Sequence, residues 1–357
     1  MLWDPAAHEE LVDEPWSEKR MRAAIRAIAD DAESAFDGGW PAHPLDSEPH
    51  DPGPWTGVYM GGAGVVDALR RLGERGLASP RDYAGYLDGL APEVPGPGLW
   101  MGDTGIVLVR HRLSPSKSTR DSLRELVAAN VADDHRELMW GSPGSILVAR
   151  ELGFDDLVQA SADRLLADRD PETGVWTQHL YGRVSQHLGP AHGFAGCVLA
   201  LGEVDGVAET VRRYAFVEDG LANWPALAND VLVRNDTIRT QWCHGAPGMV
   251  ASLAPLIDED LALAGGELTW RAGPLAKGPG LCHGTAGNGY AFLALFERTG
   301  DELWLERARA FAVHAAAQVE QTRTEHGMGR NSLWTGDLGA ALYLADCIDG
   351  AGGLPLP

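Results

Sequence analysis

The stretch Gly280–Leu295, GLCHGTAGNGYAFLAL, places a cysteine beside a histidine, then two glycines three residues apart, then an apolar run. Glycines so spaced, followed by an apolar run, occur in seven units of the chain: Gly61/Gly64, Gly102/Gly105, Gly141/Gly144, Gly193/Gly196, Gly245/Gly248, Gly284/Gly287 and Gly336/Gly339. Successive first glycines lie 39 to 52 residues apart, which is room for two helices and their turns in each unit. The stretch therefore belongs to a repeat architecture.

The apolar runs predict helices that are buried on all sides, because they are apolar around most of the helix. The segments between them are amphipathic, as in 303–321, where five apolar residues fall near one stripe: Leu303, Ala308, Phe311, Ala315 and Val319. This pattern predicts an all-α fold, an α/α toroid of seven inner and seven outer helices. The proline-rich stretches from Pro41 and Pro92 fall between units, so we interpret them as surface connections and expect residues 1–357 to form a single domain, with the repeats over roughly 55–350.

Composition limits the partners of the protein. Acidic residues outnumber basic ones by 51 to 29, and only three of the basic residues are lysines, so we expect no nucleic-acid partner. Residues 1–16 lack a basic region followed by an apolar stretch, and no apolar run approaches the roughly 20 residues that span a bilayer. Four cysteines are too few for a disulfide scaffold. These features predict a cytoplasmic protein with no membrane span.

The two residues before each first glycine differ from unit to unit. The first three units have bulky apolar pairs, and the seventh has Trp334-Thr335. The fourth, fifth and sixth units have Ala191-His192, Cys243-His244 and Cys282-His283. Because the repeat brings equivalent positions together on one rim, two Cys-His pairs in matching register predict a metal site. Thiolate and imidazole ligands suit zinc best.

Three motifs carry a resemblance to a known family: WCHGAPG at 242–248, LCHGTAGN at 281–288 and AHGFAG at 191–196. Together with the seven glycine pairs, they resemble the lanthionine synthetase C-like family over nearly the whole chain. The resemblance implies one zinc ion per chain at the mouth of the toroid, held by Cys243, Cys282 and His283. It also implies that His192 occupies the catalytic acid/base position. Recruiting His244 as a fourth ligand would instead close the site into a structural one.

Three protein ligands leave one tetrahedral position open, where a substrate thiol would be deprotonated by the metal. In the family the electrophile is a dehydroalanine or dehydrobutyrine residue of a peptide or protein. Addition of sulfur to its β-carbon leaves an enolate that needs a proton, and His192, with a pKa near neutrality, is the natural donor.

Further residues resemble the stand-alone, glutathione-adding members of the family more than its lantibiotic cyclases. Glu137 stands where the cyclases usually carry an aspartate, and Lys277 and Arg330 match a lysine and an arginine of the glutathione-adding type. The resemblance implies that Lys277 and Arg330 bind the carboxylates of the thiol. The family's N-terminal arginine has no counterpart, so another low-molecular-weight thiol remains an alternative to glutathione.

Three functions stay open at this stage. The first is zinc-dependent addition of glutathione or a similar thiol to dehydroamino-acid residues, which forms a thioether. The second is a lanthionine-forming peptide cyclase, and the third is a catalytically inactive, zinc-containing module that binds a thiol or peptide. Cys197 and Cys347 lie in apolar runs, and we interpret them as core residues.

Overall fold

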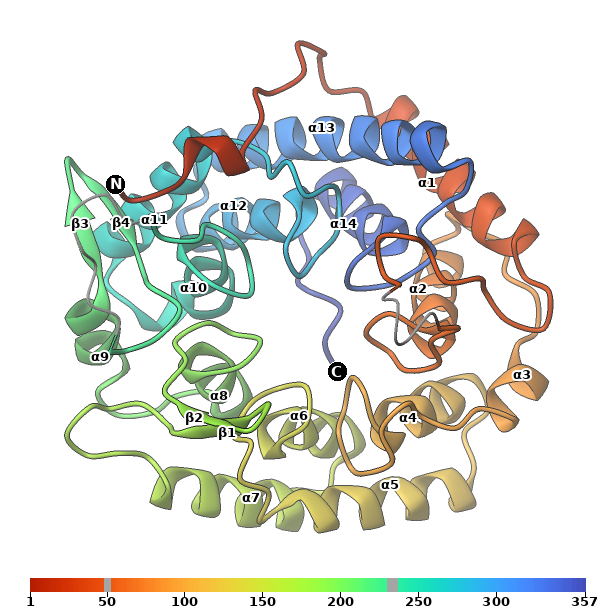
Figure 1. Cartoon of the computed structure of the whole chain (residues 1–357), viewed down its shortest axis with the longest axis horizontal. Helices are drawn as coiled ribbons and strands as arrows, with labels where there is room; N and C mark the ends of the chain where they lie inside the picture. The colour runs from red at the N-terminus through yellow and green to blue at the C-terminus, as the bar shows by residue number, and fades with distance from the viewer. Residues whose placement is uncertain (48–52, 230–236) are drawn as a thin grey trace.

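The computed structural model describes residues 1–47, 53–229 and 237–357, and these ranges contain fourteen α-helices that alternate between the outside and the inside of a ring (Figure 1). The inner helices are α2 (Gly62–Glu74), α4 (Asp103–Leu113), α6 (Ser142–Leu152), α8 (Phe194–Leu201), α10 (Ala246–Leu253), α12 (Thr285–Thr299) and α14 (Asp337–Asp349). The outer helices are α1 (Glu18–Ser34), α3 (Ala84–Asp88), α5 (Lys117–Asn130), α7 (Asp155–Ala167), α9 (Val207–Tyr214), α11 (Glu259–Ala272) and α13 (Glu302–His326). The ring closes where α14 packs against α1 and α2. The predicted α/α toroid of seven inner and seven outer helices is confirmed.

The inner helices are buried as predicted, and each is preceded by the first glycine of its motif. The outer helix α13 buries the predicted stripe except at its first position. Leu303 is 44% exposed, so its assignment to the buried face is wrong. Trp304 takes that place, four residues before Ala308, whereas Leu303 lies one residue, or about 100°, off the stripe.

The second glycine of each motif is required by a close approach of two backbones. A Cβ atom on Gly248 would lie 1.8 Å from the carbonyl oxygen of Trp242, and one on Gly287 would lie 1.7 Å from that of Leu281. In the other five motifs the carbonyl oxygen six residues earlier lies 2.1–2.3 Å from the added atom. The first turn of every inner helix therefore rests directly on the segment before it.

Those segments are joined around the ring by main-chain hydrogen bonds, which we call the rim ladder. In each bond the N–H of one unit donates to a carbonyl of the next: Tyr59 to Trp100, Trp100 to Met139, Leu138 to Ala191, Cys243 to Cys282, Cys282 to Trp334, and Trp334 to Tyr59, with N···O distances of 2.9–3.3 Å. Between the fourth and fifth units the backbones also approach closely, because a Cβ atom on Gly189 would lie 2.0 Å from the Cys243 carbonyl oxygen. The ladder makes equivalent residues of successive units neighbours.

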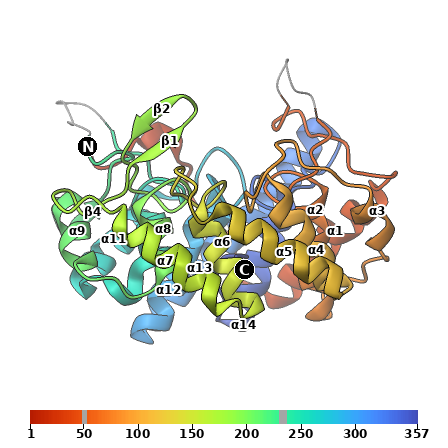
Figure 2. The same cartoon turned by 90° about the horizontal axis from the view of Figure 1, so that it is seen from below.

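Tryptophans fill the centre of the ring beside the ladder. Trp100, Trp242 and Trp334 are fully buried, with ring centroids 4.2–6.1 Å apart. Trp100 comes from one of the bulky apolar pairs that precede the first glycines, and Trp334 from the pair of the seventh unit. Two short hairpins lie in the connections, β1 (Gln178–Leu180) with β2 (Arg183–Ser185), and β3 (Phe216–Glu218) with β4 (Leu221–Asn223). The β1–β2 hairpin rises from one face of the ring (Figure 2).

Two short 3-10 helices, η1 (Pro5–Ala7) and η2 (Ala254–Leu256), complete the regular elements of the described chain. The C-terminal end lies within the ring in Figure 1. Within the described ranges, every helix is too short or too polar to cross a bilayer.

Candidate metal centre

The donor atoms of Cys243, Cys282 and His283 lie within 4.8 Å of one another. The rim ladder brings them together, since the Cys243 N–H donates to the Cys282 carbonyl at 3.0 Å. Both cysteines are buried, at 6% and 5% exposure, and His283 is partly exposed. Two thiols and one imidazole form a donor set that suits zinc, so the residues present fit the ion that the sequence predicts.

The two thiols share a hydrogen bond that affects their acidities in opposite directions. A hydrogen bond from Cys282 lowers the pKa of Cys243 well below its usual value, against the effect of burial, and His283 adds a second hydrogen bond. The same bond between the thiols, together with burial, raises the pKa of Cys282. Gln241 also donates from Nε2 to the Sγ atom of Cys243 at 2.9 Å, and Tyr59 hydrogen-bonds Cys282. A cation that replaced the shared proton would bind two thiolates.

His192 lies next to this cluster and is oriented by Glu137. Its Nδ1 atom is 3.0 Å from Oε2 of Glu137, a fully buried carboxylate. Glu137 also accepts the main-chain N–H groups of Met139 at 3.0 Å and Trp140 at 2.6 Å. Burial lowers the pKa of His192, but the hydrogen bond and negative charge of Glu137 outweigh it, so the pKa is raised. The imidazole can therefore hold a proton near neutral pH.

Two further histidines, His187 and His244, lie near His192. The ring centroids of His187 and His244 lie 6.1 and 6.3 Å from that of His192, and 5.9 Å from each other. Burial, reinforced by the neighbouring imidazoles, lowers the pKa of His187 to about 4, and burial also lowers the pKa of His244. Neutral imidazoles beside His192 leave it as the histidine of this group suited to donate a proton.

The two predicted cationic residues have different surroundings. Lys277 is exposed, and its Nζ atom lies 3.5 Å from Oε1 of Gln241, the residue that donates to Cys243. The hydrogen bond with Cys243 and burial raise the pKa of Cys282, and the positive charge of Lys277 opposes this rise, so Lys277 is coupled to the thiols. Arg330 is instead 6% exposed and forms a buried ion pair with Asp46, from Nε at 2.9 Å and from Nη2. A role of Arg330 in thiol binding requires Asp46 to give up this contact.

Sequence reasoning left several residues of the site without a role. The sequence uses Glu137 only to indicate the type of family member. Its hydrogen bond to His192 was not predicted, because no spacing rule links positions 55 residues apart. Tyr59 belongs to one of the bulky pairs that precede the first glycines, and its hydrogen bond to Cys282 was not predicted. Cys197 is buried and its thiol donates to the Arg136 carbonyl, and Cys347 is also buried. Both sulfur atoms lie outside the cluster, as expected for core residues.

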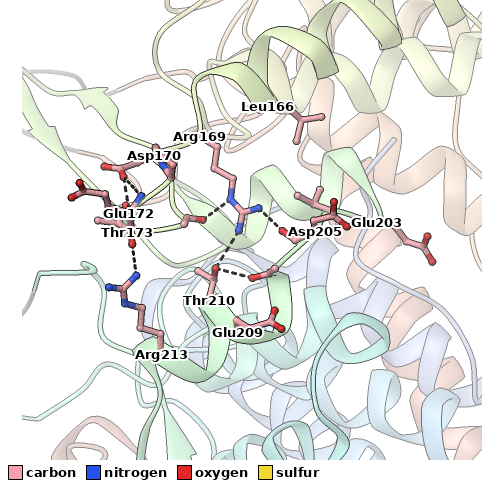
Figure 3. A pocket seen from close by; sticks show the side chains of 14 residues that line it. Leu166, Arg169, Asp170, Glu172, Thr173, Glu203, Asp205, Glu209, Thr210 and Arg213 are labelled. Carbon is pink, nitrogen blue, oxygen red and sulfur yellow. Dashed lines mark hydrogen bonds between the residues drawn. The ribbon is translucent and has the colours of Figure 1, made fainter.

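A cavity of about 670 Å³ lies elsewhere, between the end of α7 and the start of α9 (Figure 3). Its two arginines bond to the protein itself. Arg169 donates to the carbonyls of Gly174 and Asp205 and to Oγ1 of Thr210, and Arg213 donates to the carbonyl of Glu172 (Figure 3). Carboxylates make up most of its other charged lining. This cavity contains none of the predicted site residues.

Comparisons with known proteins agree with the fold and the motifs. Glutathione S-transferase LANCL1 of Danio rerio is 31% identical over 208 residues, which cover 52% of this chain and 47% of that protein. LanC-like protein GCL1 of Arabidopsis thaliana is 45% identical over 122 residues, which cover 30% of this chain and 27% of that protein. The chain thus spans less than half the length of these two relatives in the matched regions.

The solved structure of nisin cyclase superposes on 92% of this chain and 94% of its own, with a TM-score of 0.62 and 17% sequence identity. At that identity the likeness shows the fold alone. Residues 82–352 match the model of the family described as lanthionine synthetase C-like protein. That region is most of the chain and contains Cys243, Cys282, His283 and His192, so the protein belongs to the lanthionine synthetase C-like family.

Proposed function

We propose that the protein adds a low-molecular-weight thiol, glutathione or a similar compound, to dehydroalanine or dehydrobutyrine residues of peptides or proteins, in a zinc-dependent reaction. The observation that carries this proposal is the convergence of Cys243, Cys282 and His283 beside His192, the histidine whose imidazole Glu137 holds. Membership of the family and the relative named a glutathione S-transferase support it. We place the reaction in the cytoplasm.

Zinc held by the three residues would lower the pKa of a thiol bound to it, and so supply a thiolate at neutral pH. Ionisation alone is worth about 30-fold, because roughly 3% of a thiol of pKa near 8.5 is ionised at pH 7. A larger factor must come from the chain holding thiol and acceptor together. Lys277 is placed to contribute by attracting a carboxylate of the thiol.

In the reaction the sulfur forms a bond to the β-carbon of the dehydroamino acid, and the carbon–carbon double bond is lost. The α-carbon then takes a proton, so the sum is one thiol added across one double bond without oxidation. His192 is positioned to give that proton from Nε2, because Nδ1 faces Glu137. The neutral His187 and His244 keep the surroundings free of a competing cation.

The test is mass spectrometry of a dehydroalanine peptide incubated with zinc-loaded protein and a panel of thiols. The panel contains glutathione, cysteine, cysteinylglycine and the uncharged 2-mercaptoethanol. We expect a thioether product from at least one anionic thiol, formed faster than in buffer with free zinc. Ring closure by a cysteine of the same peptide, with no addition of any external thiol, would identify a cyclase. If no thioether of either kind formed above the buffer rate, the binding-module function would replace the proposal.

A further inference from the structure

A second cavity, of about 420 Å³, is lined by neighbours of His192 and Glu137. Three parts of the chain line it: the loop 94–98, the segment 133–140 with Asp133, His135 and Trp140, and the β1–β2 hairpin with Leu180 and Tyr181. Its volume falls in the range of small-ligand sites. None of the residues that bind a metal, a proton or a thiol in the proposed reaction belongs to its lining, so the cavity has no assigned role.

Tyr181 connects this cavity to the reacting centre. Its ring centroid lies 6.2 Å from that of His192, and the side chain also lines the cavity. With Gly182 it forms the two-residue turn of the hairpin, at φ values of 52° and 71°. A tyrosine rarely adopts that backbone conformation, and such positions concentrate at functional sites. The turn holds a 74% exposed aromatic ring beside the proton donor.

Trp140 makes a second connection. Its side chain lines the cavity, while its main-chain N–H donates at 2.6 Å to Glu137, the carboxylate that orients His192. The wall of the cavity and the proton donor are therefore positioned by the same segment. Successive Cα atoms of an extended peptide are 3.8 Å apart. An acceptor whose dehydroamino acid reaches His192 thus has its neighbouring residue within reach of Tyr181 and the cavity.

The far wall is held in place before any acceptor binds. Gly96 donates to Oδ2 of Asp103 at 2.9 Å, and the Asp103 N–H donates back to the Gly96 carbonyl at 2.8 Å, which fixes the loop 94–98 to the start of α4. Glu93 ties the preceding residues to the rim by accepting the Gly57 N–H at 3.0 Å. The loop leaves Val94 46% exposed at the cavity. The proline-rich stretch from Pro92, which the sequence suggests is a surface connection, is therefore also a preformed wall.

The chemistry of the lining favours an uncharged, apolar occupant. Its single carboxylate is Asp133, whose Oδ1 accepts the main-chain N–H of His135 at 2.9 Å and contacts Nδ1 of the same residue at 2.8 Å. No lysine or arginine lines the cavity, and the remaining side chains are valine, prolines, leucine, tryptophan and tyrosine. Burial of an aliphatic or aromatic side chain among them is the favourable contact that this surface offers.

We propose that this cavity receives a large apolar side chain of the acceptor polypeptide, from a residue directly flanking the dehydroamino acid. The inference deepens the proposed thiol addition and rests on it. It makes Val94, Trp140 and Tyr181 residues that determine specificity, and it makes the acceptor a chain segment extended across the rim. The protein then selects dehydroamino acids by their sequence context.

The experiment compares acceptor peptides that differ only at the residue before or after dehydroalanine, which is leucine, phenylalanine, serine or aspartate. We expect kcat/KM to be about 10- to 100-fold higher for leucine or phenylalanine on one side. Val94→Asp should remove this preference by lowering kcat/KM for the leucine or phenylalanine peptide to about that for the serine peptide, because Val94 lines the cavity. Val184→Asp is the matched control, because Val184 is 68% exposed on the same hairpin but does not line the cavity.

Binding of unreactive peptides, with alanine in place of dehydroalanine, tests the cavity without turnover. Fluorescence anisotropy should show tighter binding of the leucine peptide than the serine peptide to the wild type, and equal binding of both to Val94→Asp. If N-acetyl-dehydroalanine amide is converted but peptide context has no effect on kcat/KM or on binding, the inference is overturned and the proposed function stands. If no acceptor is converted, the proposed function fails, and the binding comparison alone decides whether the cavity selects apolar side chains.

Discussion

The Nδ1 atom of His192 lies 3.0 Å from Oε2 of Glu137, and this contact determines which nitrogen of the imidazole faces the reaction. Because Glu137 is fully buried and also accepts two main-chain N–H groups, it cannot turn away from the histidine without losing those bonds. Glu137 is thus a positioning residue that acts through His192.

Replacing Glu137 by glutamine should shift the pH dependence of the reaction. Burial lowers the pKa of His192 and Glu137 raises it, so removal of the negative charge lets that pKa fall. The proposed reaction needs the protonated imidazole, so we expect its rate to decline as pH rises through the pKa of His192. In Glu137→Gln this decline should begin at lower pH, with turnover about 10-fold or more below the wild type at pH 8. A kcat–pH profile measures it.

The control for that experiment is Glu125→Gln, which removes a carboxylate from the exposed face of α5. Its profile should match the wild type. An unchanged profile in Glu137→Gln, with zinc content also unchanged, would contradict the role of Glu137.

Replacing either Cys243 or Cys282 by alanine should abolish zinc binding, since each removes one of two thiolates from a three-residue donor set. Elemental analysis of the purified proteins gives the zinc content per chain, expected near one for the wild type and near zero for the variants. Cys347→Ala removes a buried thiol in α14 and should keep its zinc. Full zinc content in both cluster variants would rule out the proposed ligands.

His192→Asn should retain zinc but lower turnover by about 10² or more, the usual effect of removing a positioned acid. The measurement pairs zinc content with single-turnover rates at saturating thiol. Loss of zinc from this variant would instead make His192 a fourth ligand, and the site structural.

Lys277→Ala should raise KM for an anionic thiol. Because the ammonium group is exposed, we expect the lower end of the range for a charge-assisted hydrogen bond, about 1.5 kcal/mol or roughly 10-fold. KM for 2-mercaptoethanol should not change, since it carries no carboxylate. Lys117→Ala is the control, because it removes an 87% exposed lysine of α5 whose partner is Asp121 on the same helix. An equal rise in KM for both thiols would argue against carboxylate binding.

Arg330→Ala should destabilise the fold whatever its role in binding. The side chains of Arg330 and Asp46 are 7% and 5% exposed, so the variant leaves a buried carboxylate unpaired. Loss of one partner of a buried pair costs about 3–5 kcal/mol, measurable as a lower free energy of unfolding in urea. Unchanged stability combined with a higher KM for glutathione would show that the arginine serves the thiol instead.

The toroid and the thiol cluster could be predicted because both depend on local patterns that a repeat multiplies. A glycine pair such as Gly284/Gly287 marks the start of an inner helix, and matching register alone places Cys243 beside Cys282. Where a side chain points within such a unit is less certain. Leu303 and Trp304 are adjacent apolar residues, and one residue of rotation, about 100°, decides that Trp304 and not Leu303 is buried.

Contacts between distant segments could not be predicted in this way. Arg330 forms an ion pair with Asp46, which lies 284 positions earlier in the chain, and neither local sequence indicates this partner. Tyr181 lies beside His192 because it stands in the turn between β1 and β2. Each of these strands has three residues, which is too short to give a recognisable alternation of apolar and polar residues. Such residues sit in connections, where the repeat no longer constrains the chain.

The rim ladder implies that the metal-free protein stays folded. Main-chain bonds join Cys243 to Cys282, and Cys282 to Trp334, and they use none of the side-chain atoms that would hold an ion. In small zinc domains the ion organises its own ligands and chelation unfolds the chain. Here main-chain hydrogen bonds hold the ligand backbones in register, so we expect a chelator to remove a bound ion reversibly and the emptied protein to take up zinc again without refolding. The ring thus separates folding from metal loading.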